Sequence, residues 1–219
     1  MFRILAAADF AMGRVSSENL SQQAIMEILV GDMRNTKHFV DDAKTFKSIA
    51  DWPKVTLDED ENVLNADWTG MALGGSVDLS WLPSAMRLFS LRWNEMEGTA
   101  NLSHLPKRLR CLYLSNNAFC GSPDLENLPR ELERLDLSHN KFSGTLHFQT
   151  IPESLQRLHL SANSFSGTVD ISALPESIHH FSISHNMLTG VLDLRGLKST
   201  KNFGFWDNKF EKILQRGDN

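Results

Sequence analysis

The sequence predicts an α/β repeat solenoid, a mostly β right-handed superhelix, because one unit of 23 residues recurs along it. Asparagine returns at that spacing at Asn94, Asn117, Asn140, Asn163 and Asn186, and one residue early at Asn208. Five of the seven prolines keep the same period, at Pro83, Pro106, Pro129, Pro152 and Pro175. A repeat of this length buries its apolar face only against neighbouring units, so the units must stack.

Residues 1–61 precede the repeat and are predicted to form a helical N-terminal cap. Ser16 to Glu18 resemble a helix start, and apolar residues continue at helical spacing as far as Gly31. A second helix is expected from Thr36 to Ile49, and Trp52-Pro53 ends it. The cap is expected to cover the first repeat, because an open solenoid end would leave core residues exposed to water.

Residues 62–219 are predicted to form about seven turns. Leu135 and Leu137 alternate with outward residues, which is typical of a short strand, and successive strands are expected to pair in parallel into a concave sheet. The side-chain amide of Asn140 is expected to satisfy backbone groups where the chain then bends. Phe142 is expected to fill the core behind that bend.

The second half of each unit is predicted to be extended rather than helical. Gly144 is expected at a backbone angle that other residues resist. The alternating segment 145–148 after it suggests a second, shorter strand or an extended segment on the convex side rather than a long helix. Pro152-Glu-Ser is expected to form one tight helical turn, because 23 residues leave little room for a full convex helix.

The units also carry a recognisable pattern. The segment from Leu128 to Gly144 contains Leu-x-Leu-x-x-Asn, and the segment from Ile151 to Gly167 matches it nearly position for position. Residues 63 to about 213 therefore resemble a leucine-rich repeat protein with a horseshoe fold. Phe-Ser-Gly-Thr, the Leu-Pro openings and the segment from Trp52 to Val63 look most similar to plant-receptor-type repeats and to small 23-residue-repeat proteins of kinetoplastid protozoa.

This resemblance implies protein–protein recognition and identifies no ligand. In the plant type, cysteines flank the segment that corresponds to Trp52–Val63; here they are absent, with Leu57 standing in. That departure argues against a secreted, disulfide-bonded ectodomain.

Composition narrows the function further. The net charge of −5, from 22 Lys and Arg against 27 Asp and Glu, argues against a nucleic-acid partner. Cys111 and Cys120 form no metal or redox spacing. Small secreted repeat proteins often close their ends with disulfides, and this chain does not, which favours a reducing compartment and an intracellular, cytoplasmic location. The run from Met1 is too short and, at Asp9, too polar for a signal peptide or a membrane span. Whether Met1–Gly13 is a targeting segment stays open.

Candidate binding residues stand two, four and six positions before each repeat Asn, where the core does not dictate the side chain. Four small residues line the middle of this surface, namely Ser115, Ser138, Ser161 and Ser184. A protein partner is expected to lie along them, since exposed aromatic and Arg side chains anchor interfaces. The predicted site is Arg92, Tyr113, Arg134, Asp136, Arg157, His159, His180 and Trp206. The alternative is a solvated polar sheet without a partner.

Other chemistry finds less support in the sequence. His159 and His180 lie on a diagonal of about 7–8 Å with no third ligand, so no metal is expected. A row of carboxylates is expected to cap turns or stay solvated rather than bind calcium, at Asp78, Asp124, Asp170 and Asp193. Cys111 is expected to be an exposed thiol without an activating His. The histidines suggest pH-sensitive binding between about pH 5 and 8. We expect no cofactor and no enzymatic activity.

The sequence is compatible with three functions. The first is a non-enzymatic protein-interaction module that binds through the concave face. The second is a regulatory or targeting subunit of an enzyme complex that acts through the cap, and the third is an extracellular recognition or adhesion protein. At the C-terminal end, apolar residues either fold back as a lid or support a homo-oligomer: Phe203, Phe205, Phe210, Ile213 and Leu214.

Overall fold

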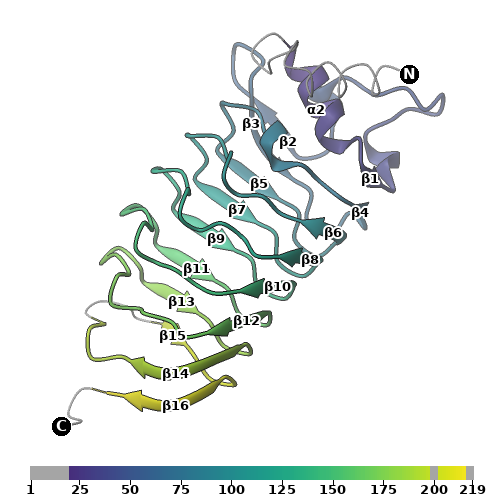
Figure 1. Cartoon of the computed structure of the whole chain (residues 1–219). Helices are drawn as coiled ribbons and strands as arrows, with labels where there is room; N and C mark the ends of the chain where they lie inside the picture. Colours follow the sequence, from purple (N-terminus) through teal and green to yellow (C-terminus); the bar gives the residue numbers. More distant parts are fainter. Residues whose placement is uncertain (1–19, 198–201, 216–219) are drawn as a thin grey trace, which may run out of the picture.

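Two sheets of eight strands run along the length of the solenoid, as the computed structural model shows for residues 20–197 and 202–215 (Figure 1). The leucine sheet carries the Leu-x-Leu segments and is ordered β2 (Val55–Leu57), β3 (Val63–Asp67), β5 (Leu88–Ser90), β7 (Cys111–Tyr113), β9 (Arg134–Asp136), β11 (Arg157–His159), β13 (His180–Ser182) and β15 (Asn202–Gly204). The glycine sheet, most of whose strands contain a turn glycine, is ordered β1 (Met33–Arg34), β4 (Gly74–Gly75), β6 (Glu95–Thr99), β8 (Ala118–Gly121), β10 (Lys141–Gly144), β12 (Ser164–Gly167), β14 (Met187–Asp193) and β16 (Lys209–Leu214). Every turn of the repeat therefore contributes one strand to each sheet.

The repeat Asn side chains hold consecutive turns together, as predicted. Asn140 Oδ1 accepts a hydrogen bond from the Phe119 N–H of the preceding turn at 3.0 Å. Its Nδ2 donates to three carbonyls, those of Leu114, Leu137 and Ser138, at 3.0–3.2 Å. The other repeat asparagines make the same set of contacts, at Asn94, Asn117, Asn163, Asn186 and Asn208. Backbone groups that the bend removes from both sheets are thereby paired.

The second strand of each unit lies earlier than predicted. β10 ends at Gly144, and residues 145–148 that follow it lie outside any strand. Gly144 has φ +92°, the left-handed region that ends the strand. The alternation after the glycine is therefore that of an extended segment, one of the two predicted forms. β6 passes its glycine by one residue, to Thr99, and β14 continues through Gly190 as far as Asp193.

Each repeat proline opens a tight turn rather than a helix. The Pro152 carbonyl accepts a hydrogen bond from the Leu155 N–H at 2.9 Å, and the other four prolines repeat this bond to the residue three positions on. One such bond closes a reverse turn. Among the described residues of the repeats, one segment is a 3-10 helix, η4 (Leu79–Trp81), and it lies in the first units.

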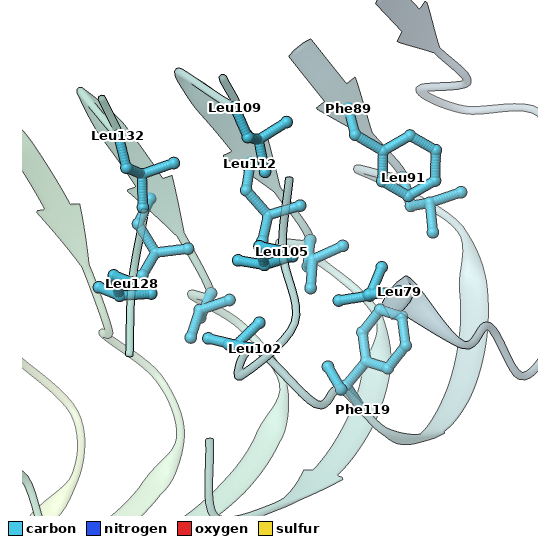
Figure 2. Packing of buried hydrophobic residues seen from close by; sticks show 14 of the residues in the cluster. Leu79, Phe89, Leu91, Leu102, Leu105, Leu109, Leu112, Phe119, Leu128 and Leu132 are labelled. Atoms are coloured by element: carbon cyan, nitrogen blue, oxygen red, sulfur yellow. The ribbon is translucent and has the colours of Figure 1, made fainter. Parts of the chain in front are cut away.

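The core fills the space between the two sheets. Leu and Phe side chains from successive turns gather in one interior (Figure 2). Phe119, Phe142 and Phe165 stack nearly parallel, with ring centroids 6.2 and 6.5 Å apart, behind the Asn ladder. All three rings are fully buried, so the prediction for Phe142 is confirmed.

The N-terminal region contains one α-helix among its described residues. α2 (Gln22–Val30) begins after Ser21, whose hydroxyl accepts the Ala24 N–H, and ends at Gly31. The helix start expected at Ser16 to Glu18 lies outside the described residues.

The second predicted helix is wrong. The segment from Thr36 to Ile49 contains the 3-10 helix η2 (Thr36–His38) and an antiparallel bridge between Val40 and Phe46, and η3 (Ile49–Asp51) follows. Asp41 Oδ1 accepts the Thr45 N–H at 2.8 Å, and Lys44 has φ +61°. This local side-chain bond competes with helix formation and turns the chain instead.

The N-terminal region nevertheless covers the first turn. β1 and β2 pair antiparallel with β4 and β3, so they close one edge of each sheet (Figure 1). Phe39 lies 4.7 Å from both Trp52 and Trp68, and Trp68 meets Phe89 edge-on at 5.5 Å. The core therefore continues from the predicted cap into the repeats, and a boundary at residues 61 and 62 stays an interpretation.

Candidate functional site

The predicted site residues lie in register on neighbouring strands of the leucine sheet. Arg134 of β9 is opposite Arg157 of β11, which is opposite His180 of β13. In the adjacent column, Tyr113 of β7 is opposite Asp136, which is opposite His159. We call this surface the outer face of the leucine sheet, because the intervening Leu and Phe residues point into the core.

Arg92 joins this surface across two turns. Its Nη2 lies 2.9 Å from Asp136 Oδ2, although 44 residues separate them. The guanidinium carbon also lies 3.7 Å from the centroid of the Tyr113 ring, a cation–π geometry. Asp136 Oδ1 accepts hydrogen bonds from the N–H and hydroxyl of Ser138 at 3.1 and 2.6 Å. Arg92, Tyr113 and Asp136 are therefore held in place by contacts within the chain.

Arg134 and Arg157 carry positive charge side by side. No ion pair joins either of them to a carboxylate within the described parts of the chain. Interaction with the Tyr113 hydroxyl raises the pKa of Arg134 further, and the Arg134 Nε is buried without a hydrogen-bond partner. Burial raises the pKa of Tyr113 against the opposing effect of Arg134. Both groups are thus protonated at neutral pH.

The two histidines of this face differ in their surroundings. Burial lowers the pKa of His159, and Asp136 acts in the opposite direction. His180 Nδ1 lies 2.9 Å from Asn202 Nδ2, which donates to it. His159 is therefore neutral at pH 7, so the fixed cations of this face are its arginines.

We call Ser115, Ser138, Ser161 and Ser184 the serine strip, and they line the middle of the outer face of the leucine sheet. Ser115, Ser138 and Ser184 are buried, and Ser184 Oγ has no hydrogen-bond partner within the described residues. At the C-terminal end, a Cβ on Gly204 would meet the Trp206 ring at 3.2 Å, so the exposed indole lies over the end of β15. The side chains of the serine strip are thus small, and the large side chains of Arg92 and Trp206 lie at its two ends.

One exposed side chain beside this face was missed from the sequence. Trp93 is 65% exposed and has φ +55°, a left-handed backbone that is rare for a bulky residue. The same position is left-handed in every other repeat, where it holds Gly70, Asn116, His139, Ala162, His185 or Asp207. A tryptophan at a position otherwise held by small or polar residues was the available signal.

The prediction that Cys111 is an exposed thiol is wrong. Cys111 is buried, because its side chain stands between the longer Leu88 and Arg134 of the two flanking strands. Cys120 on the glycine sheet is the exposed thiol of the pair.

The convex carboxylates cap turns, as expected. Asp78, Asp124, Asp170 and Asp193 each accept a hydrogen bond from the N–H two residues on, at 2.8–3.0 Å. Arg195 lowers the pKa of Asp193 to about 2. Within residues 20–197 and 202–215, no three His, Cys, Asp or Glu side chains converge to hold a metal ion. No helix in that part of the chain is both long and apolar enough to cross a bilayer.

Comparisons with known proteins agree with the repeat fold. The family model described as Leucine Rich Repeat matches residues 131–150. No curated protein sequence matches the chain significantly.

The solved structures that are similar include plant receptors. The PEPR1–AtPEP1 structure has a TM-score of 0.69 at 22% identity, over 86% of this chain and 28% of that one. A plant ice-binding protein has a TM-score of 0.64 at 21% identity, over 86% and 71%. The Arabidopsis receptor kinase HAESA, solved with the peptide hormone IDA and the co-receptor SERK1, has a TM-score of 0.56 at 20% identity, over 87% and 42%. This chain thus spans about a quarter of the PEPR1 chain and under half of HAESA. The fold of this chain is a leucine-rich-repeat solenoid, similar to the folds of plant receptor ectodomains.

Proposed function

We propose that this protein is a non-enzymatic interaction module whose outer leucine-sheet face binds a protein partner. The partner lies along the serine strip as an extended segment, and its acidic side chains meet Arg134 and Arg157. The observation that carries this proposal is the register of the two arginines on neighbouring strands. Like charges directly opposite each other destabilise a sheet, and here no ion pair among the described residues joins either arginine to a carboxylate.

The remaining residues of the face support the same interpretation. Arg92 and Tyr113 are stacked and fixed by Asp136, so little side-chain freedom is lost when they contact a partner. Trp93 and Trp206 are both more than half exposed and flank the face on separate turns. Tryptophan, tyrosine and arginine are the side chains that most often dominate the binding energy of an interface.

The fold comparisons support binding of a protein only at a coarse level. PEPR1 is solved with AtPEP1 and HAESA with the peptide hormone IDA and the co-receptor SERK1, whereas another protein of similar fold is an ice-binding protein. Since one fold hosts different functions, the side chains of the face carry the proposal.

The test is capture of partners by the immobilised protein, identified by mass spectrometry. The double variant Tyr113→Ala/Arg157→Glu should lose a partner that the wild-type protein captures, with at least a tenfold loss of affinity, about 1.4 kcal/mol. Arg130→Glu is the matched control, because Arg130 is exposed outside this face and undergoes the same change in charge. Capture that survives the double variant but fails after surface changes between residues 36 and 49 would favour the cap instead.

We also propose an intracellular location. Cys111 and Cys120 are free thiols, and Cys120 is exposed. Exposed thiols persist in reducing compartments. Fractionation of cells that express the protein would test this, and recovery in the secreted fraction would favour extracellular recognition.

A further inference from the structure

The strand β16 ends the glycine sheet on the side away from the N-terminal helix (Figure 1). In the order of the sheet it has β14 on one side and no further described strand on the other. Its outer edge therefore presents backbone N–H and C=O groups, which are a template for another strand. We propose that β16 pairs antiparallel with β16 of a second copy of this chain, about a two-fold axis between Glu211 and Lys212.

The sequence of β16 is complementary to itself in that pairing. Reading Lys209-Phe-Glu-Lys-Ile-Leu214 against its own reverse places Phe210 opposite Ile213 and Glu211 opposite Lys212. Each of these pairs occurs twice, once on either side of the axis. Two apolar pairs and two pairs of opposite charge thus meet in one interface, and each contributes about 0.2–1 kcal/mol.

The two faces of β16 match this register. Ile213 is paired with the buried Leu192 of β14, so it faces the core side, where Phe210 also packs. Lys212 is paired with the exposed Val191, so it faces outward. Cross-strand partners must share a face, and Phe210 and Ile213 do so.

A bulge supports the charged pair. The pairing with β14 passes from Phe210 directly to Lys212, so Glu211 is the extra residue of the strand and is exposed. Within the described residues, neither Glu211 nor Lys212 takes part in an ion pair. Lysines on an edge strand repel most other strands. In this register, however, each Lys212 meets a glutamate of the second copy.

The partner is a second copy for a further reason. Ile213 at the end of the solenoid is 36% exposed, and Phe203 and Phe205 of the last turn are only partly buried. A two-fold contact brings these same patches of two copies together, as an isologous interface requires. The contact uses a different surface from the outer leucine-sheet face, so each proposal can fail alone.

The experiment is sedimentation velocity of the 219-residue chain over a concentration series, with a monomer mass of 24.7 kDa. We expect the wild-type protein to shift toward twice that mass at concentrations of tens to hundreds of micromolar. Glu211→Lys and Lys212→Glu each place like charges opposite each other and should weaken the dimer at least tenfold. The double variant Glu211→Lys/Lys212→Glu restores opposite charges and should recover it.

Mixing the two single variants gives the sharpest outcome. The adjacent lysines of the Glu211→Lys variant face the adjacent glutamates of the Lys212→Glu variant. An equimolar mixture should therefore form a heterodimer although neither variant associates alone. Circular dichroism should show that both variants keep the wild-type fold, since the two positions are exposed.

The dimer also has a control outside its interface. Arg157→Glu should leave the dimer unchanged, because Arg157 lies on the outer leucine-sheet face. A wild-type protein that stays monomeric, a dimer that tolerates Glu211→Lys, or a mixture without heterodimer would each overturn the proposal.

Discussion

Arg92 and Asp136 form an ion pair across two turns of the solenoid, with Nη2 and Oδ2 2.9 Å apart. The Arg92 guanidinium covers the Tyr113 ring of the turn between them. Three successive turns are thus tied together on the outer face of the leucine sheet, and the contacts that fix the proposed site also contribute to stability.

The first prediction measures this coupling. Asp136 is 12% exposed at its side chain and Arg92 35%, so the pair is partly shielded from water. A double-mutant cycle with Arg92→Met and Asp136→Asn should give a coupling energy of about 1 kcal/mol in the free energy of unfolding by urea. Arg110 and Glu131, 3.8 Å apart and both more than half exposed, form the control pair and should couple by less than about 0.5 kcal/mol. Equal coupling in the two cycles would contradict the role of shielding.

The second prediction concerns the Asn ladder. Asn140→Ala removes four hydrogen bonds and leaves the Phe119 N–H without its acceptor beside the core. The free energy of unfolding should fall by about 2–3 kcal/mol, measured by urea denaturation. Asn127→Ala, which loses one exposed bond to Asp124, should cost less than about 1 kcal/mol. A small loss at Asn140 would mean that water replaces its amide.

A third prediction separates backbone strain from steric overlap. Gly144 and Gly98 have φ +92° and +82°, so alanine at either position is strained by about 1 kcal/mol. A Cβ at Gly144 would also lie 2.5 Å from Ser122 Oγ and 2.9 Å from Ser122 Cβ, whereas at Gly98 the nearest atom is 3.5 Å away. Gly144→Ala should therefore lower the melting temperature more than Gly98→Ala. A reversed order would show that Ser122 moves aside freely.

The fourth prediction concerns Trp93. Its left-handed backbone costs about 1 kcal/mol that asparagine, present at the equivalent Asn116, largely avoids. Because the indole is 65% exposed, Trp93→Asn should raise the free energy of unfolding by about 0.5–1 kcal/mol in urea titrations. The same variant should weaken partner binding if strain is retained there for function. A loss of stability would show that the indole packs against the protein.

The fifth prediction concerns pH. The pKa of His159 is lowered by burial, so the folded state favours the neutral ring. Its contribution to stability is present above the unfolded pKa of about 6.5 and is lost as pH falls through the lower folded pKa. The melting temperature of the wild-type protein should fall between pH 8 and 5 more than that of His159→Gln. The carboxylates with lowered pKa, such as Asp170, act only at more acidic pH and are common to both proteins. Parallel curves would exclude a role for His159.

The affinity of a partner for the outer leucine-sheet face should follow the protonation of His159. If the partner meets His159 in its neutral form, affinity stays level from about pH 8 to 6.5 and changes only below the lowered pKa. The response of the His159 ring therefore lies at the acidic end of the expected range.

The sequence by itself determined the solenoid, its 23-residue register and the face on which each free side chain lies. These follow from periodicity, since every unit must bury the same Leu, Phe and Asn positions against its neighbours. The register of Arg134 and Arg157 was therefore predictable from their distance to the next repeat Asn.

Tertiary structure alone decided what these side chains do with one another. The contact between Arg92 and Asp136 spans 44 residues, and the burial of Cys111 depends on the two strands beside it. The apolar spacing from Thr36 to Ile49 predicts a helix. The hydrogen bond from the Thr45 N–H to Asp41 and the packing of Phe39 against Trp68 instead favour a turn of the chain. Periodicity encodes which face a residue occupies, whereas pairing depends on side-chain reach and on neighbours brought together only by folding.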